Sequence, residues 1–140
     1  MCKIKSLSYT CLFVSYGTYL GEIPEARETF NVVGNVNEYG LVITESTFGG
    51  LLELENTRRD GVVDYGSLIW ITLQRTKTAR EAIAFMGALV SEYGYASTGE
   101  SFSIADPEEL WYMELIGKLY WQQYYSALTF TALQFACYFR

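Results

Sequence analysis

The sequence contains no histidine, and this absence removes several familiar kinds of catalytic and metal site. A Ser-His-Asp triad, a Cys-His dyad and a histidine-ligated zinc site all need an imidazole. The three cysteines, Cys2, Cys11 and Cys137, form no Cys-x-x-Cys pair, and their odd number does not indicate a disulfide framework. The common histidine-dependent hydrolases are therefore excluded.

Basic residues are also scarce. Ten Lys and Arg stand against 16 Asp and Glu, which gives a formal net charge of -6, and only Arg58 and Arg59 are adjacent. A nucleic-acid surface needs a basic stripe, and an anionic membrane surface attracts clustered Lys and Arg. We therefore expect neither nucleic acid nor membrane as a partner. The apolar stretch after Lys3 and Lys5 is too short for a signal peptide, so the cytoplasm is the default compartment.

The first half of the chain predicts strands. Val32-Val33 and Leu41 to Thr44 predict a hairpin, because β-branched residues favour strands. The turn between them is rich in Gly and Asn, which tolerate a positive φ angle. Upstream, "SLSYTCLFVSY" predicts a strand, and "GEIPEARE" predicts a loop because the residue before a proline resists the helical region.

Two helices are predicted at residues 64–76 and 78–94. The buried face of the first is expected to hold the side chains at helical spacing, Tyr65, Leu68, Ile69, Thr72 and Leu73. Thr78 and Glu81 fit a capping box, in which the Thr78 hydroxyl accepts from the Glu81 N–H and the Glu81 carboxylate reaches back to the Thr78 N–H. Gly94 can end the second helix.

Residues 100–117 predict two further strands, "SFSIA" and "LWYMELI", joined by the turn "DPEE". The turn residues Asp106, Glu108 and Glu109 lack the Gly and distal Glu of a calcium loop, so an acidic turn is the favoured interpretation. With 140 residues the chain has the length of one domain. The order of strands, helices and strands predicts an α+β fold with helices on one face of a mainly antiparallel sheet.

Three segments carry a resemblance to a known family: "YLGEIPEARETFNVVGNVNEYGLVITESTFGG" (19–50), "GVVDYGSLIWITLQRTKTAREAIAFMGALVSEYGY" (61–95) and "GESFSIADPEELWYMELIGK" (99–118). They are similar to the thiol dipeptidases of the N-terminal-nucleophile hydrolase superfamily, a family that also contains the secernins. The "GNVNEYGLVITESTFGG" and "ESFSIADPEELWYMELIGK" blocks are the most specific. The three segments correspond to the central part of the family's domain.

The resemblance implies an αββα sandwich of two antiparallel sheets between helical layers, here incomplete, with two central helices. It also implies hydrolysis of dipeptides through an acyl-enzyme. In this family a processed N-terminal Cys attacks the peptide carbonyl, and its own free α-amino group is the base. An unperturbed α-amino pKa of about 8 suits that role near neutral pH. The resemblance implies no metal and no other cofactor.

The start of the chain departs from the family pattern. The family's nucleophile opens a Cys-Thr/Asn-Thr/Ser motif, followed by an Asp-Gly-Ser turn, several dozen residues before the "YLGxIP" segment. Only 18 residues precede Tyr19 here, and "CKIKS" does not match that motif. Removal of Met1 would expose Cys2, which makes Cys2 the candidate catalytic nucleophile. The favoured alternative is an incidental cysteine near a start codon.

The end of the chain departs as well. After "IGK" the family continues with a Gly-rich turn and more sheet, whereas this chain continues "LYWQQYYSALTFTALQFACYFR", which is too interrupted for a membrane span. We therefore divide the chain into a divergent N-terminal segment (1–18), the central dipeptidase part (19–118) and a divergent aromatic tail (119–140). A truncated or out-of-frame product, inactive by itself, is the favoured hypothesis. The alternative is a non-catalytic binding protein that self-associates through uncovered sheet edges.

The best-matching block supplies the other candidate site residues. The resemblance implies that the Asn37-Glu38 turn and the strand after it line the substrate cleft. It further implies that backbone N–H groups near Thr47 and Phe48 help to hold the oxyanion. The favoured alternative is that Asn37 only caps its own hairpin. Glu45 and its polar neighbours could bind the amino end of a dipeptide, or they could be an exposed end of a strand.

Overall fold

The computed structural model describes residues 10–15, 18–24, 26–49, 61–116 and 120–126. The elements in chain order are β1 (Thr10–Ser15), β2 (Thr18–Pro24), β3 (Val32–Val33), β4 (Val36–Asn37), β5 (Val42–Phe48), α1 (Tyr65–Leu73), α2 (Ala79–Tyr93), β6 (Gly99–Ala105), β7 (Leu110–Ile116) and β8 (Tyr120–Ser126). Cys2 lies outside the described residues.

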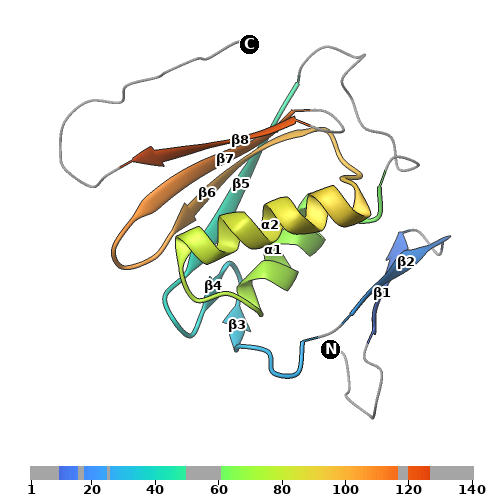
Figure 1. Cartoon of the computed structure of the whole chain (residues 1–140), viewed down its shortest axis with the longest axis horizontal. Coiled ribbons are helices and arrows are strands. Elements are labelled where there is room, and N and C mark those ends of the chain that lie inside the picture. The colour runs from blue at the N-terminus through green and yellow to red at the C-terminus, as the bar shows by residue number, and fades with distance from the viewer. Residues whose placement is uncertain (1–9, 16–17, 25, 50–60, 117–119, 127–140) are drawn as a thin grey trace.

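Six strands form one sheet in the order β3-β4-β5-β6-β7-β8, and each neighbouring pair is antiparallel. β1 and β2 form a separate antiparallel hairpin. β5 and β6 lie side by side at the centre of the sheet, although both helices intervene in the chain (Figure 1). Their pairing runs without interruption from Val42↔Ala105 to Phe48↔Gly99. The predicted α+β class, with an antiparallel sheet and two helices, is confirmed.

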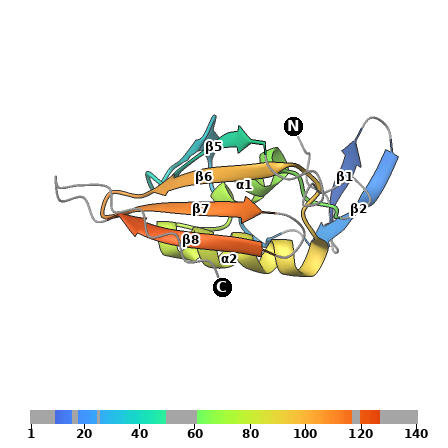
Figure 2. The same cartoon turned by 90° about the horizontal axis from the view of Figure 1, so that it is seen from above.

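The two helices pack on one face of this sheet (Figures 1 and 2). Burial along β6 alternates, with Glu100, Phe102 and Ile104 buried and the residues between them half-buried. Side chains of a strand point alternately to its two faces, so this alternation identifies the face that the helices cover. The core between the layers consists of apolar side chains from both, including Leu41, Ile43, Leu68, Leu73, Ala82, Met86, Phe102, Ile104, Met113 and Leu115.

Helix α2 begins and ends as the sequence predicts. Thr78 is the N-cap, and its hydroxyl accepts from the Glu81 N–H at 3.3 Å. The carboxylate of Glu81 differs from the prediction, because it accepts from the Lys77 N–H at 2.8 Å rather than from Thr78. The glutamate side chain is long enough to reach the amide just before the cap. At the other end, Gly94 has φ 72° and its N–H donates to the Val90 carbonyl.

Helix α1 is shorter than predicted. Asp64 is its N-cap, accepting from the Ser67 N–H at 2.7 Å, and the helix ends at Leu73 instead of residue 76. The predicted buried face is correct for four residues, but Tyr65 is 41% exposed. Ile71, which the helical stripe left out, is buried instead. The helix is buried on more than one side, so a single apolar stripe could not describe it.

Two sequence predictions need correction. The single hairpin over residues 31–48 is in fact two tight connections, because β3 pairs with the short strand β4 and β4 pairs with β5. Gly34 and Gly40 have φ 58° and 77°, and these conformations allow the chain to reverse twice. The predicted loop "GEIP" is the end of β2, where Pro24 stands at the last strand position. In addition to these two corrections, β8 (Tyr120–Ser126), in the segment for which no element was predicted, extends the sheet by pairing with β7.

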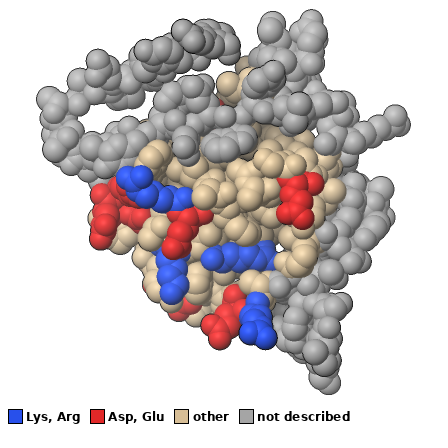
Figure 3. All heavy atoms as spheres, viewed as in Figure 1, with Lys and Arg blue, Asp and Glu red and all other residues tan. Residues whose placement is uncertain are grey.

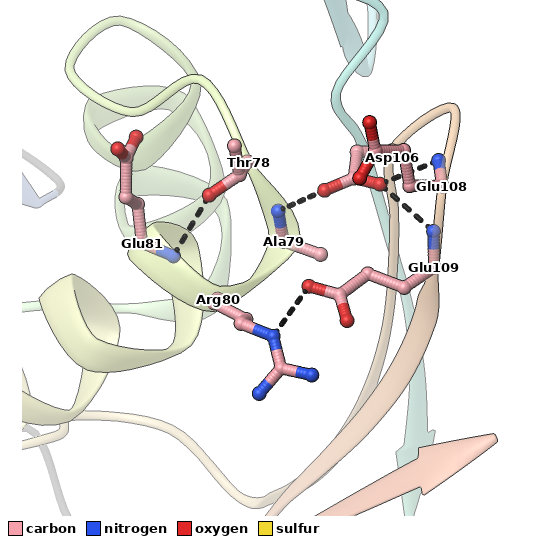
Figure 4. A network of polar contacts seen from close by, with 7 residues as sticks. All are labelled: Thr78, Ala79, Arg80, Glu81, Asp106, Glu108 and Glu109. Atoms are coloured by element: carbon pink, nitrogen blue, oxygen red, sulfur yellow. Dashed lines mark hydrogen bonds and ion pairs between the residues drawn. The ribbon is translucent and has the colours of Figure 1, made fainter. Parts of the chain in front are cut away.

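Asp106 connects the sheet to helix α2 (Figure 4). Its Oδ1 accepts from the N–H groups of Glu108 and Glu109 at 2.8 and 2.9 Å, and its Oδ2 accepts from the Ala79 N–H at 2.8 Å. Burial disfavours the charged carboxylate, but these hydrogen bonds and the nearby Arg80 outweigh burial and lower the pKa of Asp106. The turn interpretation of "DPEE" is therefore confirmed.

We predict that Asp106→Ala lowers the free energy of unfolding by about 2 kcal/mol, because one substitution removes the acceptor of one helix-terminal N–H and of two turn N–H groups. Urea denaturation near neutral pH measures this change, with the exposed Glu108→Ala as control, expected within about 0.5 kcal/mol of wild type. The folded pKa is lowered, so the Asp106 contribution is present above the ordinary pKa and is lost as pH falls through the folded value. Equal effects of the two substitutions would contradict this role.

Candidate functional site

Thr47 and Glu100 are directly paired where β5 ends and β6 begins. The Thr47 Oγ1 donates a hydrogen bond to the Glu100 Oε1 at 2.9 Å. The Thr47 side chain is exposed, whereas the Glu100 side chain is 0% exposed. A predicted site residue is thus held in place by a buried carboxyl group.

Phe48 and Gly99 form the next pair along the same strands. A Cβ atom on Gly99 would lie 2.6 Å from the Phe48 Cε2, so only glycine fits beneath the ring. The Phe48 ring therefore packs directly on the β6 backbone. Thr47 and Phe48 are brought together with Gly99 and Glu100 at one end of the central strand pair.

Glu100 lies in an unusual electrostatic environment. Burial and the neighbouring Glu45 carboxylate raise the pKa of Glu100 to about 7, although the Thr47 hydroxyl acts in the opposite direction. Tyr95 is 1% exposed, and burial followed by the charge of Glu100 raises the pKa of its phenol. This end of the sheet therefore combines acidic and hydroxyl groups away from water.

Asn37 lies at the other end of β5, and its side chain is 5% exposed. Its Nδ2 donates to the carbonyls of Leu73 and Thr76 at 2.9 and 2.8 Å, and its Oδ1 accepts from the N–H groups of Tyr39 and Leu41 at 3.0 and 3.1 Å. Both amide hydrogens and both oxygen lone pairs are thereby used. Asn37 joins the β4–β5 turn to the carbonyl of Leu73, the last residue of α1, and to the carbonyl of Thr76, which follows the helix. The Leu73 carbonyl is thereby occupied where a further helical turn would need it, which accounts for the early end of α1.

The structure does not bring the two groups of predicted site residues together. Leu41, beside Asn37, is separated from Thr47 by six residues of extended chain, about 20 Å at roughly 3.3 Å per residue. Glu38 is exposed, and its carboxylate accepts from the backbone N–H and the Nδ2 of Asn31 at 3.0 and 3.2 Å. Asn37 and Glu38 therefore form a separate cluster from Thr47 and Phe48.

Sequence reasoning missed Glu100 and Tyr95. A signal for Glu100 is present, because Glu100, Phe102 and Ile104 alternate in phase and a strand places alternate residues on one face. No such signal marks Tyr95, which follows α2 in an irregular segment and forms no part of its helical stripe.

The charges around the helices are mixed in sign. Figure 3 shows basic and acidic side chains interspersed on the face that carries α2. One pair is Arg80 Nε and Glu109 Oε1, which are 2.9 Å apart. Within the described ranges, no group of three or more His, Cys, Asp or Glu side chains is arranged to hold a metal ion. No helix in the same ranges is long and apolar enough to cross a membrane.

The structure is thus an α+β domain with helices over one face of an antiparallel sheet. Comparison with known proteins identifies the family. The model of the family described as "Peptidase family C69" matches residues 4–124 of this chain. The chain therefore belongs to peptidase family C69.

Two curated relatives are similar to shorter parts of the chain. A "Probable dipeptidase B" of Streptococcus pyogenes serotype M1 is 29% identical over 84 residues, which cover 57% of this chain and 16% of the relative. A "Dipeptidase" of Bifidobacterium longum (strain NCC 2705) is 37% identical over 62 residues, which cover 44% of this chain and 11% of the relative. The matched regions are thus a small part of each relative's length.

We predict that Asn37→Ala lowers the free energy of unfolding by about 3 kcal/mol, because the carbonyls of Leu73 and Thr76 lose a buried donor. Asn31→Ala is the matched control, since the exposed Asn31 amide donates only to the exposed Glu38, and we expect a loss below about 1 kcal/mol. Chemical denaturation of both variants measures the difference. A loss at Asn37 no larger than that at Asn31 would show that the buried hydrogen bonds do not stabilise the fold.

Proposed function

We propose that this chain is part of a cysteine-type dipeptidase, which hydrolyses the peptide bond of dipeptides through an acyl-enzyme. The observation that carries the proposal is the family match over residues 4–124, and the names of the relatives agree with it. The chain spans about one-sixth or less of the curated relatives it matches, so the activity is proposed for the domain to which it corresponds.

The proposed chemistry uses Cys2 after removal of Met1. The Cys2 thiol gives its proton to its own α-amino group, and the sulfur forms a bond to the peptide carbonyl carbon. The carbon–nitrogen bond then breaks, and the α-ammonium returns the proton to the leaving amine. A water molecule attacks the resulting thioester, which releases the acid product and regenerates the thiol. Every proton is thus carried without histidine.

Thr47 and Phe48 are the residues we propose for the oxyanion region. β5 pairs with β6 along its whole length, but its other edge pairs with β4 only at Val42. Among the described strands, nothing pairs with that edge beside residues 44–48. The Ile43 N–H donates across this edge to the Asn35 carbonyl. N–H groups alternate along a strand, so the Thr47 N–H faces the unpaired edge and the Phe48 N–H faces β6. A backbone N–H on an unpaired edge is free to donate to a developing negative charge. The hydrogen bond of Thr47 to the buried Glu100 and the contact of Phe48 with Gly99 would hold this end of β5 in position.

Asn37 and Glu38 have a different place in this proposal. A dipeptide spans about 7 Å at roughly 3.5 Å per residue, so it cannot contact both ends of β5. We propose that substrate lies near Thr47 and that Asn37 fixes the start of the strand. The amide groups of Asn37 are already satisfied within the fold, which supports a positioning role.

The αββα sandwich is also part of the proposal. The face of β6 and β7 opposite the helices carries half-buried residues, including Ser101, Ser103, Leu110, Tyr112 and Ile116. These small and apolar side chains are suited to packing against a second sheet. We propose that this second layer completes the sandwich in the intact domain.

We predict that any release of amino acids from a panel of dipeptides by the processed chain is abolished by Cys2→Ala, because sulfur is the attacking atom. A form that retains Met1 is expected to be equally inactive, since its α-amino group no longer belongs to the cysteine. Mass spectrometry of the products measures turnover. Cys11→Ala is the matched control and should retain activity. Turnover that survives Cys2→Ala would rule out the role of Cys2.

A second candidate function is non-catalytic self-association. Val33 and Val36 pair across the β3–β4 hairpin at the edge of the sheet, and they are 82% and 42% exposed. Exposed apolar groups on an open sheet edge favour association with another chain. Light scattering across a concentration series is expected to show a rising mean mass that Val33→Lys reduces. A monomer at every concentration would exclude this candidate.

A further inference from the structure

Glu45 and Glu100 face one another across the two central strands. Glu100 pairs directly with Thr47, and Glu45 stands two residues before Thr47 on β5. Both glutamates therefore lie on the helix-covered face as diagonal neighbours, a spacing that two long side chains can span.

If both carboxyl groups of this pair are ionised, they offer more hydrogen-bond acceptors than there are donors. The Glu100 Oε1 accepts from Thr47, but Glu100 Oε2 and Glu45 Oε2 are buried and have no donor. Two ionised carboxylates offer only acceptors and repel each other. One proton between them would turn two unpaired acceptors into a donor and an acceptor.

The described groups that act on this pair supply no compensating positive charge. The pKa of Glu100 is affected by Glu45 from β5 and by the Thr47 hydroxyl. The pKa of Tyr95, which follows α2, is affected by both glutamates and by Asp64 at the start of α1. None of these described groups is basic. Burial and the Glu45 side chain together raise the pKa of Glu100, which is the direction expected when charge is disfavoured.

We propose that Glu45 and Glu100 share a single proton, and that this carboxyl–carboxylate hydrogen bond fastens the Thr47 end of β5 to β6. The proposal of a shared proton depends only on the contacts described above. Its further role, positioning Thr47 for catalysis, rests on the proposed dipeptidase function. Glu100 is then a positioning residue, which acts on substrate only through Thr47.

The pair makes stability depend on pH in a defined direction. The folded pKa of about 7 exceeds the ordinary value of 4.5, so the folded state holds the proton over a range where the unfolded state has released it. The contribution of the pair is therefore complete below about pH 4.5 and is lost as pH rises through about 7. Within that window the folding equilibrium constant falls by at most about tenfold per pH unit for one proton.

The experiment is urea denaturation of the full chain at several pH values between about 5 and about 8. In Glu100→Gln, the amide oxygen can still accept from Thr47 and the amide nitrogen can donate permanently to Glu45. We expect this variant to lose the pH dependence and to exceed wild type in stability at pH 8. The exposed Glu28→Gln is the matched control and should retain the wild-type slope. The same slope in Glu100→Gln as in wild type would overturn the proposal.

Substitutions of Thr47 test its hydrogen bond to Glu100 by changing the donor. The Thr47 hydroxyl lowers the pKa of Glu100, so Thr47→Val should move the stability transition to higher pH, and Thr47→Ser should restore it. A transition that stays in place in Thr47→Val would contradict the arrangement.

Infrared difference spectra of the wild-type chain give a reading that needs no variant to fold. A protonated carboxyl band that titrates near pH 7 is expected, and its absence at pH 5.5 would overturn the shared proton. Because no readout uses dipeptide hydrolysis, a failure here is distinguishable from a failure of the proposed function.

Discussion

The attachment of the helix pair to one end of the sheet is the constraint on which the rest of the structure depends. Asn37 binds the carbonyls of Leu73 and Thr76, and Asp106 binds the N–H of Ala79. Two turns of the sheet thus hold the short connection between α1 and α2 from both sides. Each side chain also accepts hydrogen bonds within its own turn, which fixes its position. The helices therefore have one position over the sheet, and the apolar core fills the space between the layers.

Local signals predicted the elements that local interactions create. The Thr78 cap, the Gly94 terminus and the alternation of β6 and β7 are readable from neighbouring residues, and all three are found in the structure. The failures involve distant partners. The early end of α1 depends on Asn37, a residue more than 30 positions away in sequence. The division of one hairpin into two depends on pairings that β-branched content alone does not specify.

The candidate site was only partly predictable for the same reason. Motif resemblance indicated Thr47, Phe48, Asn37 and Glu38, but it gave no distances, and the structure separates them into two clusters along β5. The buried carboxyl beneath Thr47 comes from a strand that follows both helices, so no window of sequence contains the pair. Cys2 lies outside the described residues, and its role stays a prediction.

The central pairing of β5 with β6 also has a consequence for the order of folding. Thr47 and Glu100 are 53 residues apart in the chain, whereas the β6–β7 connection and the α1–α2 connection are each only a few residues long. Closing a long loop costs more conformational entropy than closing a short one. The helical hairpin and the β6–β7 hairpin can therefore form early and independently, and β5 joins β6 only when the helices between them have brought the strand ends together. We therefore expect this long-range closure to be the slow step of folding.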